Sequence, residues 1–383
     1  TRAMSSGATT SRIWYMRLKV RILITTLFLS LFGLVMIYSA SSYSAKVNMG
    51  DEFYYVKKQA LAFAAGLAAM FAATKIKTEF LKKIRWIIYS VAMVLLLILF
   101  IPGVGSTSYG ATRWIDLKVI TFQPSEIAKF ALVMLLAGEF SERPPISFKY
   151  AIIPALSGIA MCVAVMMEPN MSITMCIGLT MLTMLFLGGM RGRYFIFASS
   201  VAAAGVPALI FAEPYRIRRL LAFINPWDSP LEEGYQLIQS YYALGSGGLF
   251  GVGLFASRQK YLFLPFAESD FIFSVIGEEL GLFGSVLVLG VFFVLIVSGI
   301  MVAMRAEDRY NSLLAAGITT VIAVQTLINI AVVSGSIPPT GLPLPYISAG
   351  GSSLIVFMFA SGLLINIAGR QAKFGPPSTQ TRK

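Results

Sequence analysis

The acidic residue best placed to do chemistry is Asp270, which lies where a long polar segment enters an apolar stretch, FLPFAESDFIFSVIGEELG (263–281). A carboxylate at such a boundary is suited to general-base catalysis on a substrate presented at membrane level. Asp is also a preferred helix N-cap, and its charge suits a helix N-terminus. Position alone therefore leaves both a catalytic base and a helix cap open for Asp270.

Two further carboxylates, Glu278 and Glu279, follow Asp270 about two helical turns deeper in the same apolar stretch. Ionisable groups at that depth are costly and usually face the protein interior or a water-filled cavity. On a helix, Glu278 lies about 80° and Glu279 about 180° around the axis from Asp270. We therefore expect Glu278 to share the cavity of Asp270, with a bond to a neighbouring helix as the alternative.

Glu126 and Lys129 form a second charged pair inside an apolar stretch. Residues three apart share a helix face, so the two charges can neutralise one another. The pattern is compatible with a structural ion pair between helices and with one wall of a charged, substrate-binding cavity.

Arginines in the segment 214–227 (PYRIRRLLAFINPW) are candidates for binding an anion. Arg216 and Arg219 share one face of a short amphipathic helix, whose apolar residues place it in the membrane interface. Guanidinium groups on that face would hold a phosphate group. An anchor to lipid headgroups is the alternative.

Three other features of the polar segments could contact a phosphorylated or sugar substrate. The glycine-rich stretch 245–253 would expose backbone N–H groups to a phosphate, although a bend is the simpler interpretation. Arg258 and Lys260 follow it closely and add positive charge. Arg113 and Trp114 would pair with a phosphate and stack on a sugar, or Trp114 would belong to an interfacial aromatic belt.

The elements that must position these residues are membrane spans. Hydrophobic residues make up 57% and charged residues 13% of the 383 residues, so the apolar surface must face lipid. Apolar stretches of spanning length occur at 22–40, 58–74, 86–102, 124–140, 150–167, 171–189, 194–212, 271–303, 311–333 and 351–369. We predict an all-α polytopic membrane protein with about ten transmembrane helices, without a cleavable signal peptide.

The formal net charge is +13. In a membrane protein we interpret this charge as basic residues that set the orientation in the membrane and attract anionic lipid headgroups, rather than as a nucleic-acid binding surface. The short outer loops contain few basic residues, namely Lys46, Lys57, Lys58, Arg113 and Lys118. The chain therefore divides into a cytoplasmic tail (1–21), a membrane domain (22–369) and a second cytoplasmic tail (370–383). A large extracytoplasmic loop, 213–269, lies between the seventh and eighth spans.

Several kinds of site are excluded or disfavoured by composition. The chain contains no histidine, which excludes a Ser-His-Asp triad and histidine metal sites. The two cysteines, Cys162 and Cys176, lie within apolar stretches and indicate neither a disulfide framework nor a metal site.

Six motifs in order resemble the SEDS family (shape, elongation, division and sporulation). They are GATRWI (110–115), QPSEIAKF (123–130), PYRIRRLLAFINPWDSP (214–230), GYQLIQSYYALGSGGLFGVGL (234–254), LPFAESDFIFSVIGEELGLFG (264–284) and IPPTGLPLPYISAGGSSL (337–354). The resemblance runs from about residue 20 to residue 369. The segments at 214–230 and 234–254 are more similar to the FtsW and SpoVE branch than to RodA.

The resemblance implies a bacterial peptidoglycan glycosyltransferase that polymerises lipid II at the outer face of the cytoplasmic membrane. It implies that Asp270 is the essential base and that undecaprenyl pyrophosphate leaves with inversion at the anomeric carbon. The resemblance also implies a functional role for Trp114 and for the pair of Glu126 and Lys129, which match family positions. Thr340 occupies a position where some division members carry Lys. Candidates for binding the leaving group are Arg216, Arg219, Arg258 and Lys260. No cofactor is certain, and a divalent cation, Mg²⁺ or Mn²⁺, remains compatible with the resemblance.

The sequence departs from the family pattern at several positions. Glu168-Pro169-Asn170 stands where the family usually has Gln-Pro-Asp, and Met171-Ser172 follows where Gly-Thr is usual. Glu268-Ser269 precedes Asp270 where His-Thr or Gln-Thr is usual, and Ala349 replaces a Tyr. We expect Glu268 to raise the pKa of Asp270 by like-charge repulsion.

The resemblance also implies partners and leaves alternatives. The expected partner is a class B penicillin-binding protein with transpeptidase activity, joined by other division proteins. A lipid II transporter would place polar groups near the membrane midplane in inverted repeats. A non-catalytic scaffold for the transpeptidase would need no acidic residue at a cavity mouth.

Overall fold

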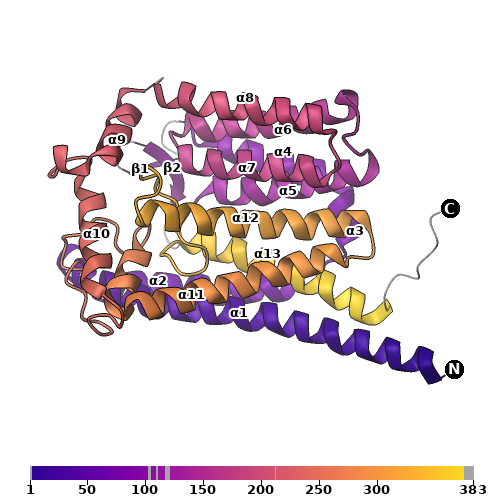
Figure 1. The fold of residues 1–383 in the computed structure, drawn as a ribbon, viewed down its shortest axis with the longest axis horizontal. Helices are drawn as coiled ribbons and strands as arrows, with labels where there is room; N and C mark the ends of the chain where they lie inside the picture. Colours follow the sequence, from indigo (N-terminus) through magenta and orange to yellow (C-terminus); the bar gives the residue numbers. More distant parts are fainter. Residues whose placement is uncertain (1, 102–104, 109–110, 117–120, 212, 375–383) are drawn as a thin grey trace.

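The long helices of the protein run roughly alongside one another, and the shorter elements gather at one end (Figure 1). A computed structural model describes residues 2–101, 105–108, 111–116, 121–211 and 213–374. The long helices are α1 (Arg2–Met49), α2 (Tyr54–Ala73), α4 (Arg85–Ile98), α5 (Pro124–Glu142), α6 (Phe148–Met167), α7 (Met171–Leu187), α8 (Gly192–Phe211), α11 (Ile272–Met304), α12 (Arg309–Val333) and α13 (Gly351–Phe374). A helix thus lies in each predicted apolar range, and the prediction of an all-α polytopic membrane protein is confirmed.

Length and apolar composition show which described helices qualify as membrane spans. Seven of them are long and apolar enough to cross a membrane, namely α1, α2, α6, α8, α11, α12 and α13. The apolar helices α4 and α7 are shorter, and α5 carries Glu126, Lys129 and Glu139. The count of about ten spans therefore stays a prediction.

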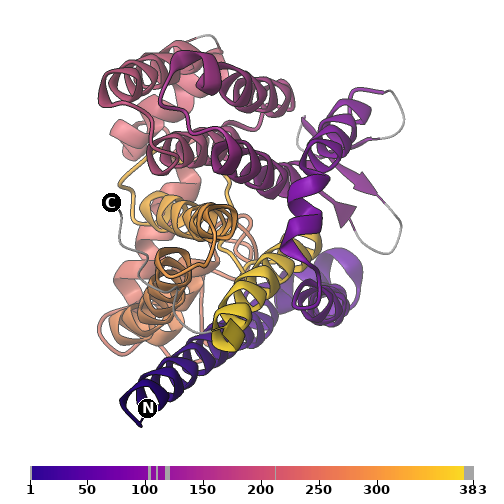
Figure 2. The same ribbon diagram turned by 90° about the vertical axis from the view of Figure 1, so that its right-hand side faces the viewer.

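The connecting segments contain structure that the sequence analysis did not anticipate. Between α4 and α5, strands β1 (Gly105–Ser108), β2 (Ala111–Asp116) and β3 (Thr121–Phe122) form an antiparallel sheet in that order. The sheet lies at the side of the bundle, next to α4 (Figure 2). The predicted outer loop 213–269 contains α9 (Pro214–Ile224), a 3₁₀ turn η1 (Pro226–Asp228) and α10 (Tyr235–Gly247). A short helix α3 (Thr78–Lys83) precedes α4.

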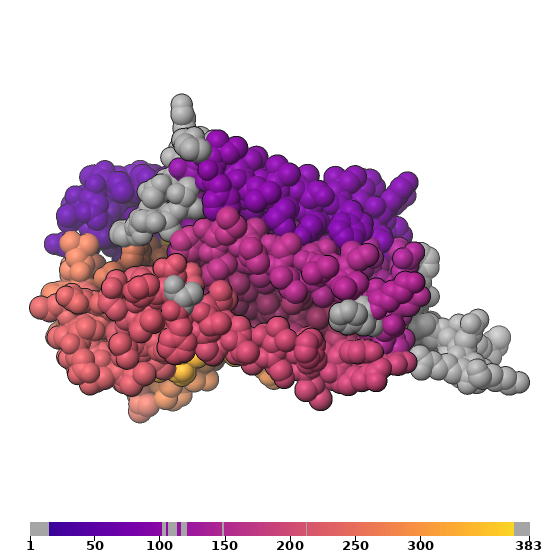
Figure 3. All heavy atoms as spheres, turned by 90° about the horizontal axis from the view of Figure 1, so that it is seen from above, coloured from indigo at the N-terminus to yellow at the C-terminus, as the bar shows by residue number. Residues whose placement is uncertain are grey.

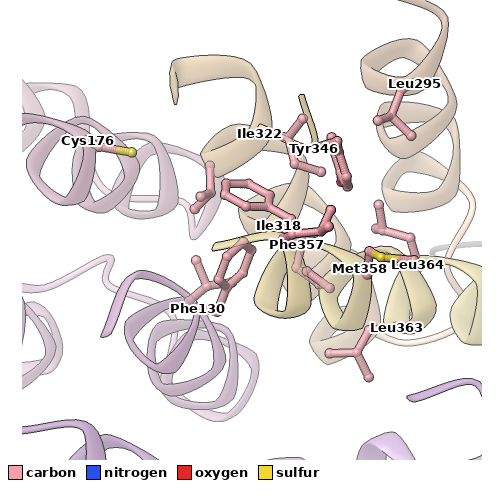
Figure 4. Packing of buried hydrophobic residues seen from close by; sticks show 14 of the residues in the cluster. Phe130, Cys176, Leu295, Ile318, Ile322, Tyr346, Phe357, Met358, Leu363 and Leu364 are labelled. Atoms are coloured by element: carbon pink, nitrogen blue, oxygen red, sulfur yellow. The ribbon is translucent and has the colours of Figure 1, made fainter. Parts of the chain in front are cut away.

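Small residues and aromatic rings hold the centre of the bundle together. Helix α13 packs most extensively against α2, where Gly362 lies against the backbone of α2 and Gly66 against Met358. Glycines at such positions allow helix backbones to approach closely. Phe357 meets the rings of Phe130 and Tyr346 edge-on, at centroid distances of 5.3 and 5.5 Å (Figure 4). These contacts join α5, α13 and the segment 334–350 into one rigid support.

The helices differ in how far neighbouring helices enclose them. Helix α8 has no buried residue, whereas α13 is largely enclosed. Figure 3 shows the face of the molecule that carries α8, with the segment of α9 and α10 at one end. Because α8 leads directly into α9, an exposed span positions the arginine-rich helix at that end.

Candidate active site

Asp270 lies at the end of the bundle that carries the sheet, α9 and α10, two residues before α11 begins. Its backbone is held by neighbouring elements. Asn329 of α12 donates from Nδ2 to the carbonyl oxygen of Asp270 at 2.8 Å. The hydroxyl of Ser348 donates to the carbonyl oxygen of Ser269 at 2.5 Å. These bonds fix the backbone that carries the candidate base.

The Asp270 carboxyl group is half-buried and surrounded by charge. Burial raises its pKa to about 6, while Arg113 and Arg219 oppose the increase and Glu268 adds to it. The expected repulsion by Glu268 thus has the predicted sign, although burial is the larger cause. Gly341 has a φ of +68°, and a Cβ there would lie 3.1 Å from Oδ2 of Asp270. Glycine is therefore needed where the 334–350 segment passes this carboxylate.

Arg113 reaches the site from strand β2. Its Nε donates to the carbonyl oxygen of Glu168 at 3.2 Å, and its Nη2 donates to that of Pro169. The break between α6 and α7 thus positions the guanidinium group whose charge acts on Asp270. Trp114 is the next residue of β2 and is half-buried, and its backbone pairs with Ser106 of β1.

The arginines of α9 have different places. Arg219 donates from Nη1 to the carbonyl oxygen of Pro339 at 3.3 Å, and its guanidinium lies 4.7 Å from the ring centre of Tyr215. Arg216 instead donates to the carbonyl oxygen of Leu209 at 2.7 Å, at the end of α8. The structure thus brings Arg219 to Asp270 and uses Arg216 to join α8 to α9.

A cavity of about 360 Å³ opens beside this cluster. It is lined by Tyr215, Arg219, Glu232, Glu233, Tyr235, Gln236, Pro265 and Pro339. Its size falls within the range of small-molecule sites, roughly 300–1,000 Å³. Arg219 connects the cavity to Asp270, and Thr340 follows directly after the lining residue Pro339. The hydroxyl oxygen of Thr340 is buried without a hydrogen-bond partner among the described residues.

Glu278 does not share the cavity of Asp270, which corrects the expectation from helical geometry. Its carboxylate accepts hydrogen bonds from the hydroxyl of Ser257 at 2.5 Å and from the backbone N–H of Arg258 at 2.9 Å. The side chain of Arg258 is exposed. Glu278 therefore accepts the hydrogen bonds of the turn that follows the glycine-rich stretch, and its carboxylate holds that turn in place.

Lys260 is likewise committed to the protein interior. It is 6% exposed, donates to the carbonyl oxygen of Phe255 and lies 3.6 Å from Oε1 of Glu279. Glu279 also accepts a bond from Ser39 of α1 at 2.5 Å. This ion pair ties the loop to α1 and α11, and Lys260 does not reach Asp270.

The backbone of the glycine-rich stretch 245–253 is hydrogen-bonded to α11 and does not form a phosphate-binding loop. Val252 and Gly253 donate backbone N–H groups to the carbonyl oxygens of Glu278 and Glu279, at 2.9 and 3.1 Å. Gly281 interrupts α11 with a φ of 66° and a ψ of −163°. Only glycine adopts that conformation readily, so Gly281 allows the backbones to meet. These amides are used internally and are not directed at a ligand.

Glu126 and Lys129 form a fully buried ion pair at 2.9 Å, with both side chains 0% exposed. Lys129 also donates to Oε1 of Gln325, and Ser353 donates to Oε2 of Glu126 at 3.0 Å. The pair joins α5, α12 and α13 and lies away from the cavity lining. This geometry corresponds to a structural ion pair between helices rather than to one wall of a substrate-binding cavity.

The donor set around Asp270 does not fit a divalent cation. Within the part of the chain that the structure describes, no three His, Cys, Asp or Glu side chains group as metal ligands. The nearest charges to Asp270 include two guanidinium groups, Arg113 and Arg219. Hard cations need several oxygen ligands, and two neighbouring guanidinium groups repel a further cation, so this arrangement does not favour a bound divalent metal ion.

The fold and this site define a class, namely a multi-pass membrane protein with a charged site at one end of its helix bundle. The sequence model of the FtsW/RodA/SpoVE family, described as cell cycle proteins, matches residues 20–373. The chain belongs to this family, as the motif resemblance predicted.

Curated relatives cover nearly the whole length of the chain. Stage V sporulation protein E of Bacillus subtilis is 40% identical over 351 residues, which are 91% of this chain and 96% of that protein. A probable peptidoglycan glycosyltransferase FtsW of Geobacter metallireducens is 39% identical over 357 residues, 91% of this chain and 94% of that protein.

Solved structures share the fold. A chain of a peptidoglycan synthase complex that coordinates polymerization and crosslinking has a TM-score of 0.76 at 25% identity, covering 92% of this chain and 98% of that chain. The rod shape determining protein RodA of Thermus thermophilus has a TM-score of 0.68 at 23% identity, covering 91% and 96%. The second likeness concerns the fold alone.

Proposed function

We propose that this chain is a peptidoglycan glycosyltransferase that polymerises lipid II, with Asp270 as its general base. The observation that carries the proposal is the half-buried Asp270 carboxyl group, on which the charges of Arg113 and Arg219 act, with Arg219 also lining the cavity. Its raised pKa suits a base that accepts a proton near neutral pH. The names of the FtsW relatives support the same reaction class.

The proposed reaction transfers a lipid-linked glycan to an acceptor sugar. Asp270 takes the proton from the 4-hydroxyl group of the acceptor, and that oxygen attacks the anomeric carbon of the donor chain. The bond from that carbon to the pyrophosphate oxygen breaks with inversion. Undecaprenyl pyrophosphate leaves, and the proton on Asp270 passes to solvent.

Positive charge stabilises the departing pyrophosphate. Arg219 is better placed for this role than Arg216, Arg258 or Lys260, because its charge acts on Asp270 and its side chain lines the cavity. Arg113 supplies a second charge from β2. Tyr215 and Tyr235 offer aromatic faces to the sugars in the same cavity.

The membrane orientation that fits this reaction places Asp270 outside and both termini in the cytoplasm. The start of α1 and the end of α13 lie at the end of the bundle opposite α9 and α10 (Figure 1). Arg305 lies in the loop between α11 and α12, Arg191 lies in the loop between α7 and α8, and Arg193 lies in the first turn of α8. These positive charges favour a cytoplasmic location for that end of the bundle. In this arrangement residues 22–369 form the membrane domain, and the segment 213–269 is extracytoplasmic.

The proposed partner is a class B penicillin-binding protein, which would crosslink the strands that this chain makes. The support is the likeness to a chain from a peptidoglycan synthase complex. Purified protein in liposomes with this transpeptidase and labelled lipid II tests the function. Glycan strands on a gel are the expected product. Lipid II that only changes leaflet would indicate a transporter, and neither product would indicate a scaffold.

A further inference from the structure

Glu168 is a deeply buried acid that the proposed reaction does not use. It follows α6 directly, and its side chain is 1% exposed. Neither carboxyl oxygen has a hydrogen-bond partner among the described residues. Buried carboxylates are normally paired with a cation or satisfied by several donors, so this group needs an explanation.

The nearest charge to Glu168 is Arg113, which is already bound to the same turn. Arg113 donates to the carbonyl oxygens of Glu168 and Pro169, so the guanidinium lies against the backbone of the acid. The charges of Asp270 and Arg219 also act on Arg113, as does Tyr215. One guanidinium group therefore lies in the field of two carboxyl groups on different elements.

The remaining charges around these groups are few. Arg113 is the charged group that acts on Glu168. Asp270 additionally faces Arg219 and Glu268. A change in the charge of Glu168 is consequently transmitted to Asp270 through Arg113.

Burial raises the pKa of Glu168 to about 8, and Arg113 only partly opposes this increase. At neutral pH the carboxyl group is thus mainly protonated, and the charge of Arg113 is available to Asp270 and to an anionic leaving group. Loss of the proton to solvent above about pH 8 creates a carboxylate beside Arg113. That carboxylate attracts the guanidinium and offsets its charge at close range.

We propose that Glu168 is a positioning residue for Arg113. While Glu168 is protonated, the charge of Arg113 acts on Asp270 and on the substrate; when Glu168 is ionised, it pairs with Arg113 and removes that charge from them. The inference rests on the proposed function, because it concerns the same reaction. It adds a group that controls the alkaline side of the activity.

Initial rates of lipid II polymerisation between about pH 5 and about pH 9.5, which extends at least one unit beyond the pKa of Asp270 and that of Glu168, test the proposal. Wild type should lose about tenfold of its rate for each pH unit above about 8. Glu168→Gln cannot ionise, so its rate should stay level over the same interval. Glu307→Gln removes an exposed acid from the loop between α11 and α12, at the opposite end of the bundle, and should keep the wild-type profile.

Infrared difference spectroscopy on the full chain gives a second measurement that does not need activity. A protonated-carboxyl band should be present at neutral pH, disappear with a midpoint near pH 8, and be missing in Glu168→Gln. If that variant does not fold, Arg113→Gln replaces it, and the midpoint should rise because the opposing cation is gone.

Different results overturn the two proposals. Wild type that makes no glycan strands refutes the proposed function, whereas the infrared test still applies. Wild type that polymerises with the same alkaline loss as Glu168→Gln refutes the role of Glu168. A band that does not titrate, or does not move in Arg113→Gln, refutes it as well.

Discussion

The buried pair of Glu126 and Lys129 gives a sharp test of what holds the bundle together. Both side chains are 0% exposed, and Lys129 bonds to Glu126 and Gln325 while Ser353 bonds to Glu126. Replacing Lys129 by Met leaves Glu126 buried with Ser353 as its remaining partner. Breaking a buried ion pair in this way costs about 3–5 kcal/mol. Lys129→Met should therefore lower the free energy of unfolding by about that amount.

The assay is equilibrium unfolding in mixed detergent micelles, followed through a double-mutant cycle with Glu126→Gln. The double variant buries no charge, so it should be more stable than the sum of the single changes predicts, by about 2 kcal/mol or more. The control is Lys57→Met, because Lys57 forms an exposed pair with Asp51 at 2.7 Å and should leave the transition in place. A loss below about 1 kcal/mol for Lys129→Met, or strict additivity, would refute the reasoning.

Three predictions concern the site. Polymerisation should fall about tenfold per pH unit below about 6, since Asp270 must be ionised to accept a proton; a rate that is level down to about pH 5 in initial-rate assays would contradict this. Gly341→Ala places a Cβ 3.1 Å from Oδ2 of Asp270 in a backbone with φ +68°, so the rate should fall by about tenfold to a hundredfold, and a loss under about twofold would count against it. Arg219→Ala should slow polymerisation by about a hundredfold, whereas Arg218→Ala should slow it much less, because the Arg218 side chain is 60% exposed and its charge is not among those that act on Asp270; equal losses would show that proximity to Asp270 is irrelevant.

The helices were predictable because a membrane requires long apolar stretches, and each such stretch forms a helix. Helix α10 and the sheet were missed, since their segments are short, mixed in polarity and rich in glycine. Helix α9 was predicted from its amphipathic arginine pattern and is present. Local periodicity therefore accounts for the scaffold better than for the connecting segments.

The site was only partly predictable. Asp270, Arg113, Arg219 and Thr340 were all named from sequence, and they lie on or beside the same cluster. Lys260 and Glu278 were expected there as well, but Lys260 pairs with Glu279 and Glu278 bonds to Ser257 instead. No helical angle could reveal that, because the partners come from tertiary structure.

Two supporting residues had weaker signals in the sequence. The side chain of Asn329 holds the backbone of Asp270, but the sequence shows only a polar residue within a span, a type that commonly bonds to a neighbouring helix. Glu168 was visible only as an acid between two spans where the family usually has Gln. Its burial without a partner could be recognised only in three dimensions.

The central claim is that Asp270 is the base of the transfer reaction. Its most direct test is the initial rate of lipid II polymerisation for wild type and Asp270→Asn, with Asp228→Asn as an exposed control from the same loop. Asn keeps the size of the side chain but cannot accept the proton, so the rate should fall by about 10²–10⁴-fold, while the control stays near wild type. An Asp270→Asn protein that folds and polymerises within about tenfold of wild type would contradict the account.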